Sequence, residues 1–156
     1  MMLVVLAVMF LVISQPARAQ YERFNLAMSF GTLTDDSFSF KPFFWTSGLN
    51  LDVYLSENIV PSSEFFIIVH NFNFDAFLLA PGAILNFNFG GFMIGGGVVK
   101  FWLVGSAISG APSSDPALKL NTGYMGEGIR LTAFVITPFG DLFKSNTLGV
   151  SLGFYF

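Results

Sequence analysis

The chain has 156 residues, of which 53% are hydrophobic and 11% are charged, and its net charge at pH 7 is −3. Average soluble domains carry about 25% charged residues, so this chain has unusually little charge with which to hold a domain in water. The small negative charge removes the electrostatic basis for binding nucleic acid, and the absence of cysteine excludes disulfides and thiolate metal sites. With 21 Phe and 16 Gly, the composition favours strands and tight turns over a coiled coil or a disordered chain.

The first nineteen residues have the pattern of an export signal. An apolar stretch at 3–13 ends before Pro16, and Ala17-Arg18-Ala19 fits a small-x-small cleavage site. The stretch is shorter than the ~20 residues of a spanning helix. We therefore predict a signal peptide at 1–19, cleaved after Ala19, and one domain at 20–156. Because no Lys or Arg precedes the stretch, an uncleaved N-terminal anchor is the alternative.

The remaining chain alternates apolar and small or polar residues with a period of two, which predicts strands. Glycine pairs or near-pairs at 90–91 and 126–128 predict tight turns, since glycine accepts the positive φ of such turns. The connection at 56–63 contains Pro61, so either this turn is enlarged or the following strand begins earlier. The eight predicted strands are 21–33, 43–55, 64–74, 83–89, 92–105, 118–125, 129–137 and 147–156.

Strands of about nine to eleven residues can cross a bilayer when tilted. The predicted connections at 34–42, 75–82, 106–117 and 138–146 are long and alternate with shorter turns, as in outer-membrane barrels with long outer loops. Glu22, Glu57, Glu64 and Glu127 are expected at the opposite, inner end. The sequence thus predicts an all-β, eight-stranded antiparallel up-and-down transmembrane barrel.

Polar residues on the faces opposite the apolar ones are expected to point into the barrel. An eight-stranded barrel is only wide enough for side chains to fill it, so no open pore is expected. Asp52 is predicted to pair with Arg130 or Lys100, and Lys100 is assigned to the inner face together with Gly96 and Val98. The predicted polar network of the lumen consists of Asn50, Asp52, Lys100, Lys119 and Arg130, with a structural role in satisfying buried polar groups.

The last nine residues alternate without interruption and end on an aromatic residue. Leu148, Val150, Leu152, Phe154 and Phe156 share one face of this strand. In this respect the chain resembles the small outer-membrane barrels of the OmpA/OmpX type, a resemblance that covers the signal, the strand rhythm and the final strand. It implies that Leu152, Phe154 and Phe156 form the assembly signal read by the barrel-assembly machinery. It also implies a monomer in the bacterial outer membrane, surrounded by lipid and lipopolysaccharide.

The expected function is a non-enzymatic, structural or surface-interaction role, with no cofactor and no metal. Two alternatives stay open. His70, the only histidine, is the residue that a lipid-modifying acyl hydrolase or acyltransferase would use, although His70-Asn71-Phe72 lacks the serine of a His-x-Ser arrangement. The other alternative is transfer of a small apolar ligand.

A GxxxG pattern at Gly91–Gly95 also permits a spanning helix in the apolar stretch up to Ile108, but three successive glycines at 95–97 and Lys100 argue against it.

Overall fold

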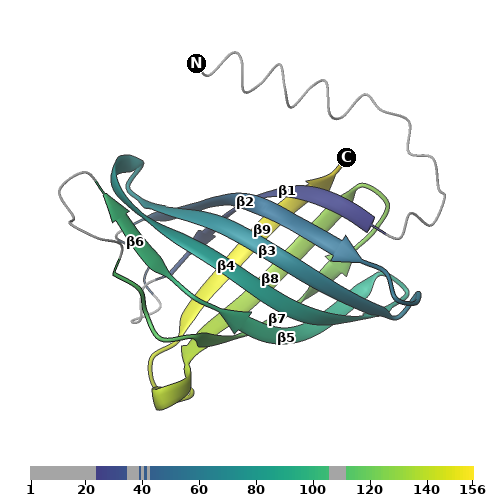
Figure 1. Ribbon diagram of the computed structural model, residues 1–156. Coiled ribbons are helices and arrows are strands. Elements are labelled where there is room, and N and C mark those ends of the chain that lie inside the picture. Colours follow the sequence, from purple (N-terminus) through teal and green to yellow (C-terminus); the bar gives the residue numbers. More distant parts are fainter. Residues whose placement is uncertain (1–23, 35–38, 40, 42, 106–111) are drawn as a thin grey trace, which may run out of the picture.

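Antiparallel pairing joins neighbouring strands all the way round, and the pairing of β3 (Ile59–His70) with β4 (Asn73–Phe89) closes the sheet into a barrel (Figure 1). The computed structural model describes residues 24–34, 39, 41, 43–105 and 112–156. The predicted signal peptide and Glu22 lie outside these ranges. Among the described residues, the only helix is the short 3-10 turn η1 (Phe139–Asp141), and no helix is long and apolar enough to span a membrane. The strands are β1 (Phe24–Leu33), β2 (Phe44–Val53), β3 (Ile59–His70), β4 (Asn73–Phe89), β5 (Phe92–Val99), β6 (Trp102–Gly105), β7 (Ala117–Met125), β8 (Ile129–Pro138) and β9 (Thr147–Tyr155).

The described segments form eight full strands of the barrel wall, which we call staves, because β5 and β6 are two parts of one strand. Both pair with β4 in a continuous register, with Gly82 opposite Val99 and Leu79 opposite Trp102. The gap between them lies beside Pro81, which has no N–H to give to the ladder. The helical interpretation of the glycine-rich stretch is therefore wrong, since 92–99 and 102–105 are strands.

The strands are strongly staggered. We measure the stagger by moving from each residue to its partner on the next strand, once round the barrel. Starting at Phe44, the first residue of β2, this path returns at Tyr54, the residue just after β2 and ten residues further along the chain. The last step continues the β2–β3 register, which a hydrogen bond from the Leu55 amide to the Ile59 carbonyl (3.1 Å) extends. A stagger of this kind accompanies strands tilted by about 35–45° in a barrel whose interior only side chains can fill.

The two ends of the barrel differ. Short connections join β2 to β3, β4 to β5 and β7 to β8 at one end, which we call the turn end, and Phe156 lies there too. The opposite end, the loop end, has the connections 34–43, 106–116 and 139–146. It also has the two-residue turn Asn71-Phe72, whose φ angles are 46° and 57°. Gly90-Gly91 forms the predicted tight turn, with φ angles of 63° and 95°.

The positions of two prolines explain where the predicted boundaries were wrong. Of the two alternatives for 56–63, the earlier start of the strand is confirmed, because β3 begins at Ile59 and includes Pro61. The loop expected at 75–82 is wrong, because β4 runs through this segment and includes Pro81. Pro61 lies just beyond the last β2–β3 pair, and Pro81 on β4 lies opposite the gap between β5 and β6. Each proline is therefore at a position where the hydrogen-bond ladder to a neighbouring strand is interrupted.

The two faces of the wall are chemically different. The outer face is apolar, whereas the interior has an apolar layer near each end and a polar layer between them. Near the turn end, Val60, Met93 and Met125 pack together. Near the loop end, the larger apolar layer contains Leu33, Phe66, Ile68, Ala80, Val99, Ala117, Phe134 and Ile136.

Candidate functional site

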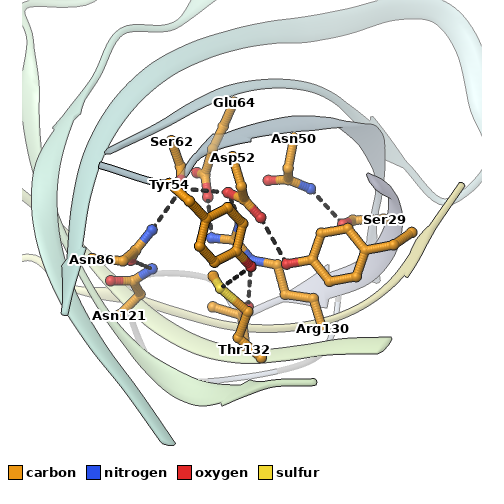
Figure 2. Close-up of polar contacts among 12 residues, drawn as sticks. Ser29, Asn50, Asp52, Tyr54, Ser62, Glu64, Asn86, Asn121, Arg130 and Thr132 are labelled. Atoms are coloured by element: carbon orange, nitrogen blue, oxygen red, sulfur yellow. Dashed lines mark hydrogen bonds and ion pairs between the residues drawn. The ribbon is translucent and has the colours of Figure 1, made fainter. Parts of the chain in front are cut away.

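Four acidic and basic side chains meet in the polar layer inside the barrel, and Figure 2 shows three of them, Asp52, Glu64 and Arg130. Arg130 on β8 donates from Nη1 to Asp52 Oδ1 on β2 at 2.6 Å and from Nη2 to Glu64 Oε1 on β3 at 3.2 Å. Lys119 on β7 donates from Nζ to the other oxygen of Glu64. Each of the four side chains is at most 4% exposed. Strands β2, β3, β7 and β8 are therefore tied together through the lumen, and we call these four residues the ion-pair cluster.

Neutral polar groups bond to Asp52 and extend the network, in which Asn121 Oδ1 is left without a hydrogen-bond partner among the described residues. Asp52 accepts a hydrogen bond from the Ser62 hydroxyl, and its second oxygen accepts one from the Tyr155 hydroxyl at 2.7 Å. The Asn86 amide donates to Ser62 Oγ at 2.7 Å, and Asn121 donates to Asn86 Oδ1 at 3.0 Å. Figure 2 shows this network beside the separate pair in which Asn50 donates to Ser29. Because a buried polar group without a partner costs about 1–3 kcal/mol, such a network stabilises one register of the strands.

The cluster is electrically balanced. Two cations face two carboxylates, which is the condition under which buried charges are tolerated. On its loop-end side, Lys119 Nζ lies 4.9 Å from the centre of the Phe66 ring and 4.3 Å from that of Phe134. These rings begin the apolar layer, and the space left beside Lys119 is about 20 Å³, room for about one water molecule.

The predicted lumen residues divide into two groups. Asn50, Asp52, Lys119 and Arg130 are buried inside the barrel, and the pair Asp52–Arg130 forms as one of the two predicted alternatives. Lys100 does not join them, and its assignment to the inner face is wrong.

On this strand the inward and outward positions are the reverse of those predicted. Val99 is 5% exposed and Val98 is 45% exposed, so Val99 points inward and Val98 outward. Lys100 is partly exposed, next to Trp102, whose ring centre is 5.3 Å from Nζ. Both faces of this strand are apolar in sequence, and the sequence therefore gave no basis for choosing between them.

Sequence reasoning missed Glu64. We expected this residue at the inner end of the barrel, at the start of a strand, whereas it lies in the middle of β3 and contacts both cations. In the structure Glu64 shares the inner face with Val60, Ser62 and Phe66, which occupy alternate positions and are all buried. The proline between the first two of them concealed the alternation.

His70 lies at the loop end of β3 and is exposed. Its ring is tilted against that of Phe44, with centres 5.4 Å apart, and Nε2 is 3.2 Å from the side-chain nitrogen Nδ2 of Asn71. Within the described part of the chain, no group of three or more His, Cys, Asp or Glu side chains is placed to hold a metal ion.

The predicted assembly residues lie at the turn-end half of β9 and just after it. Leu152 and Phe154 share the outer face, and the Phe156 amide donates to the Leu26 carbonyl at 3.1 Å. No protein-family model matches the sequence, and a comparison with curated proteins gives no significant match. The barrel and its interior are thus the basis for proposing a function.

Proposed function

We propose that this protein is an integral outer-membrane β-barrel with a filled lumen and a structural or surface-interaction role. The observation that carries the proposal is a belt of exposed apolar side chains on the outer face of the barrel. In water, a patch of this size would be an aggregation site, whereas in a bilayer it is the required surface. The belt contains Phe24, Met28, Leu49, Leu51, Phe65, Leu85, Phe87, Phe92, Ile94, Val98, Leu120, Ile129, Leu131, Leu148, Val150 and Leu152.

The height of the belt supports a membrane location. A strand of about ten residues rises ~3.3 Å per residue, so at a tilt of about 45° it spans ~23 Å, close to the ~25 Å apolar band of outer-membrane barrels. Of the ionised residues in the eight staves, the four of the ion-pair cluster point inward and Asp75 lies beside the turn at the loop end. The remaining described acids and bases lie in connections, apart from Lys100 in the interrupted strand and His70 at the loop end of β3.

Both tryptophans lie near the loop end, Trp45 as the second residue of β2 and Trp102 as the first of β6. Tryptophan is favoured where an apolar wall meets water, and a lysine beside it extends its ammonium group towards the polar side. Lys100 next to Trp102 fits this position. The loop end then faces outward and the turn end faces the periplasm.

The lumen supports a role without conduction. The ion-pair cluster and the apolar layer above it occupy the interior, and the cavity beside Lys119 is too narrow for a solute larger than water. We therefore propose a monomeric barrel that displays its loop end, is inserted by the barrel-assembly machinery through the C-terminal strand, and performs no catalysis.

A pair of arginine substitutions tests the membrane location. Leu49 lies in the middle of β2 and is 45% exposed, and Phe139 lies beyond β8 and is 49% exposed. In a bilayer, Leu49→Arg should lower the free energy of unfolding by about 2–4 kcal/mol, and Phe139→Arg by less than about 1 kcal/mol. A soluble barrel would tolerate both equally. The readouts are fractionation of the cells and the mobility of unboiled protein on gels, where a folded barrel migrates differently from the boiled chain.

The competing enzymatic function has its own test. If His70 acted on lipid, His70→Ala would change the lipid A profile measured by mass spectrometry. We expect the same profile as for the unaltered protein, and a lost or new acyl species would replace our proposal with an acyl hydrolase or acyltransferase.

A further inference from the structure

A groove of about 300 Å³ runs along the outer wall of the barrel, between β1–β2 and β8–β9. Trp45 and Phe43 bound it at the loop end, and Leu131 and Leu152 bound it closer to mid-barrel. Its floor is formed by Thr32 and by the backbone of Gly31 and Ser151, two positions whose Cβ direction faces the lumen.

A ladder of aromatic rings lies along one wall of the groove; Phe30, Trp45 and Phe43 line the groove, and Phe72 contacts the last two without lining it. The ring centres of Phe30 and Trp45 are 5.9 Å apart, those of Trp45 and Phe72 5.6 Å, and those of Phe72 and Phe43 5.8 Å. Contacts of this kind stabilise aromatic rings beyond the area that they bury, so the rings hold one another in place without a ligand. The ladder follows the groove from mid-barrel to the loop end.

The surface of the groove offers almost no polar group that is free to hydrogen-bond a ligand. The Thr32 hydroxyl already donates to the Phe44 carbonyl at 2.9 Å, and Ser151 is 7% exposed. A polar ligand would find little to bind. At ~30 Å³ for each water-sized group, the volume holds roughly ten methylene groups.

We propose that this groove binds one acyl chain of a lipopolysaccharide molecule in the outer leaflet. The proposal rests on the proposed membrane location and goes beyond it, because it distinguishes one retained lipid from the lipids that exchange around the belt. The groove is continuous with the belt through Leu131, Val150 and Leu152, and from there it extends to the loop end at Phe43 and Trp45, the end that would lie in the outer leaflet. The wall of a second barrel is convex and would rest on the ladder without reaching the floor, whereas a slender hydrocarbon chain reaches it.

The test compares two threonines in matched settings. Thr32 and Thr122 both use their hydroxyl to bond a carbonyl of the adjacent strand, Phe44 at 2.9 Å and Met93 at 3.0 Å, but Thr122 is outside the groove. Thr32→Phe should fill the groove, and Thr122→Phe should leave it open. Each protein is extracted from outer membranes in mild detergent, and the lipids that stay bound after gel filtration are identified by mass spectrometry.

The unaltered protein and Thr122→Phe should retain about one lipopolysaccharide molecule per barrel, and Thr32→Phe should retain at least tenfold less. If Thr32→Phe does not fold, Val150→Trp fills the groove from the opposite wall, where Val150 is 48% exposed. Equal retention in all folded variants, retention of phospholipid in place of lipopolysaccharide, or dimers without lipid would overturn the proposal. Gel mobility and fractionation are recorded on the same samples, so failure of the groove is distinguished from absence of the barrel from the membrane.

Discussion

The cation that links the two carboxylates inside the barrel provides the sharpest test of the ion-pair cluster. Arg130 is 2% exposed and contacts Asp52 at 2.6 Å and Glu64 at 3.2 Å. Replacing it with Met keeps much of the volume and removes both contacts. Lys119 then pairs with Glu64 alone, Asp52 loses its cationic partner, and the buried cluster changes from neutral to one net negative charge.

An uncompensated buried charge of this kind costs about 3–5 kcal/mol, so we expect Arg130→Met to lower the free energy of unfolding by that amount. Adding Asp52→Asn restores neutrality and leaves the Lys119–Glu64 pair intact. The double variant should therefore regain at least about 1 kcal/mol relative to Arg130→Met, which is a coupling typical of neighbouring groups.

The matched control is Lys144→Met. Lys144 also pairs with a carboxylate, at 3.7 Å from Asp141, but the two side chains are 79% and 63% exposed. Exposed pairs contribute between about zero and 1 kcal/mol, so this substitution should have little effect. All variants are unfolded by urea in detergent micelles, and the folded fraction is read from unboiled gels. If Arg130→Met lies within about 1 kcal/mol of Lys144→Met, or the double variant is less stable than the single one, the electrostatic reasoning is refuted.

Of three further predictions, the first two use the same unfolding assay and the third uses membrane fractionation. Gly97→Ala should impair folding, because a Cβ there would overlap the carbonyl oxygen of Ala83, whereas Gly140→Ala meets nothing within 4 Å and should be neutral; equal stability of the two would show that β4 and β5 can separate without cost. Phe143→Gly should stabilise the β8–β9 connection by about 1 kcal/mol, since Phe143 is 64% exposed at a φ of 63° that glycine adopts without strain, and a lower urea midpoint would contradict this. Deleting Phe156 should reduce the amount of barrel in outer-membrane fractions, and normal insertion would count against the assembly signal.

The sequence by itself determined the strand rhythm of this protein. Alternation with a period of two is a local property, and it correctly assigned Asp52 to the interior and Leu51 to the exterior from the neighbours of each residue. The count of eight staves and the tight turn at Gly90-Gly91 followed from the same local pattern.

Tertiary structure decided which buried residues meet. Glu64 and Lys119 are 55 residues apart in the chain and belong to β3 and β7, and only the stagger of the closed barrel brings them to the same height. It also decided the direction of Lys100, on a strand whose two faces are both apolar, and it allowed Pro61 and Pro81 to remain inside strands where a neighbouring ladder is interrupted. Local pattern fixes which way a side chain points within its own strand, but its partner depends on register, which is set by closure of the whole sheet.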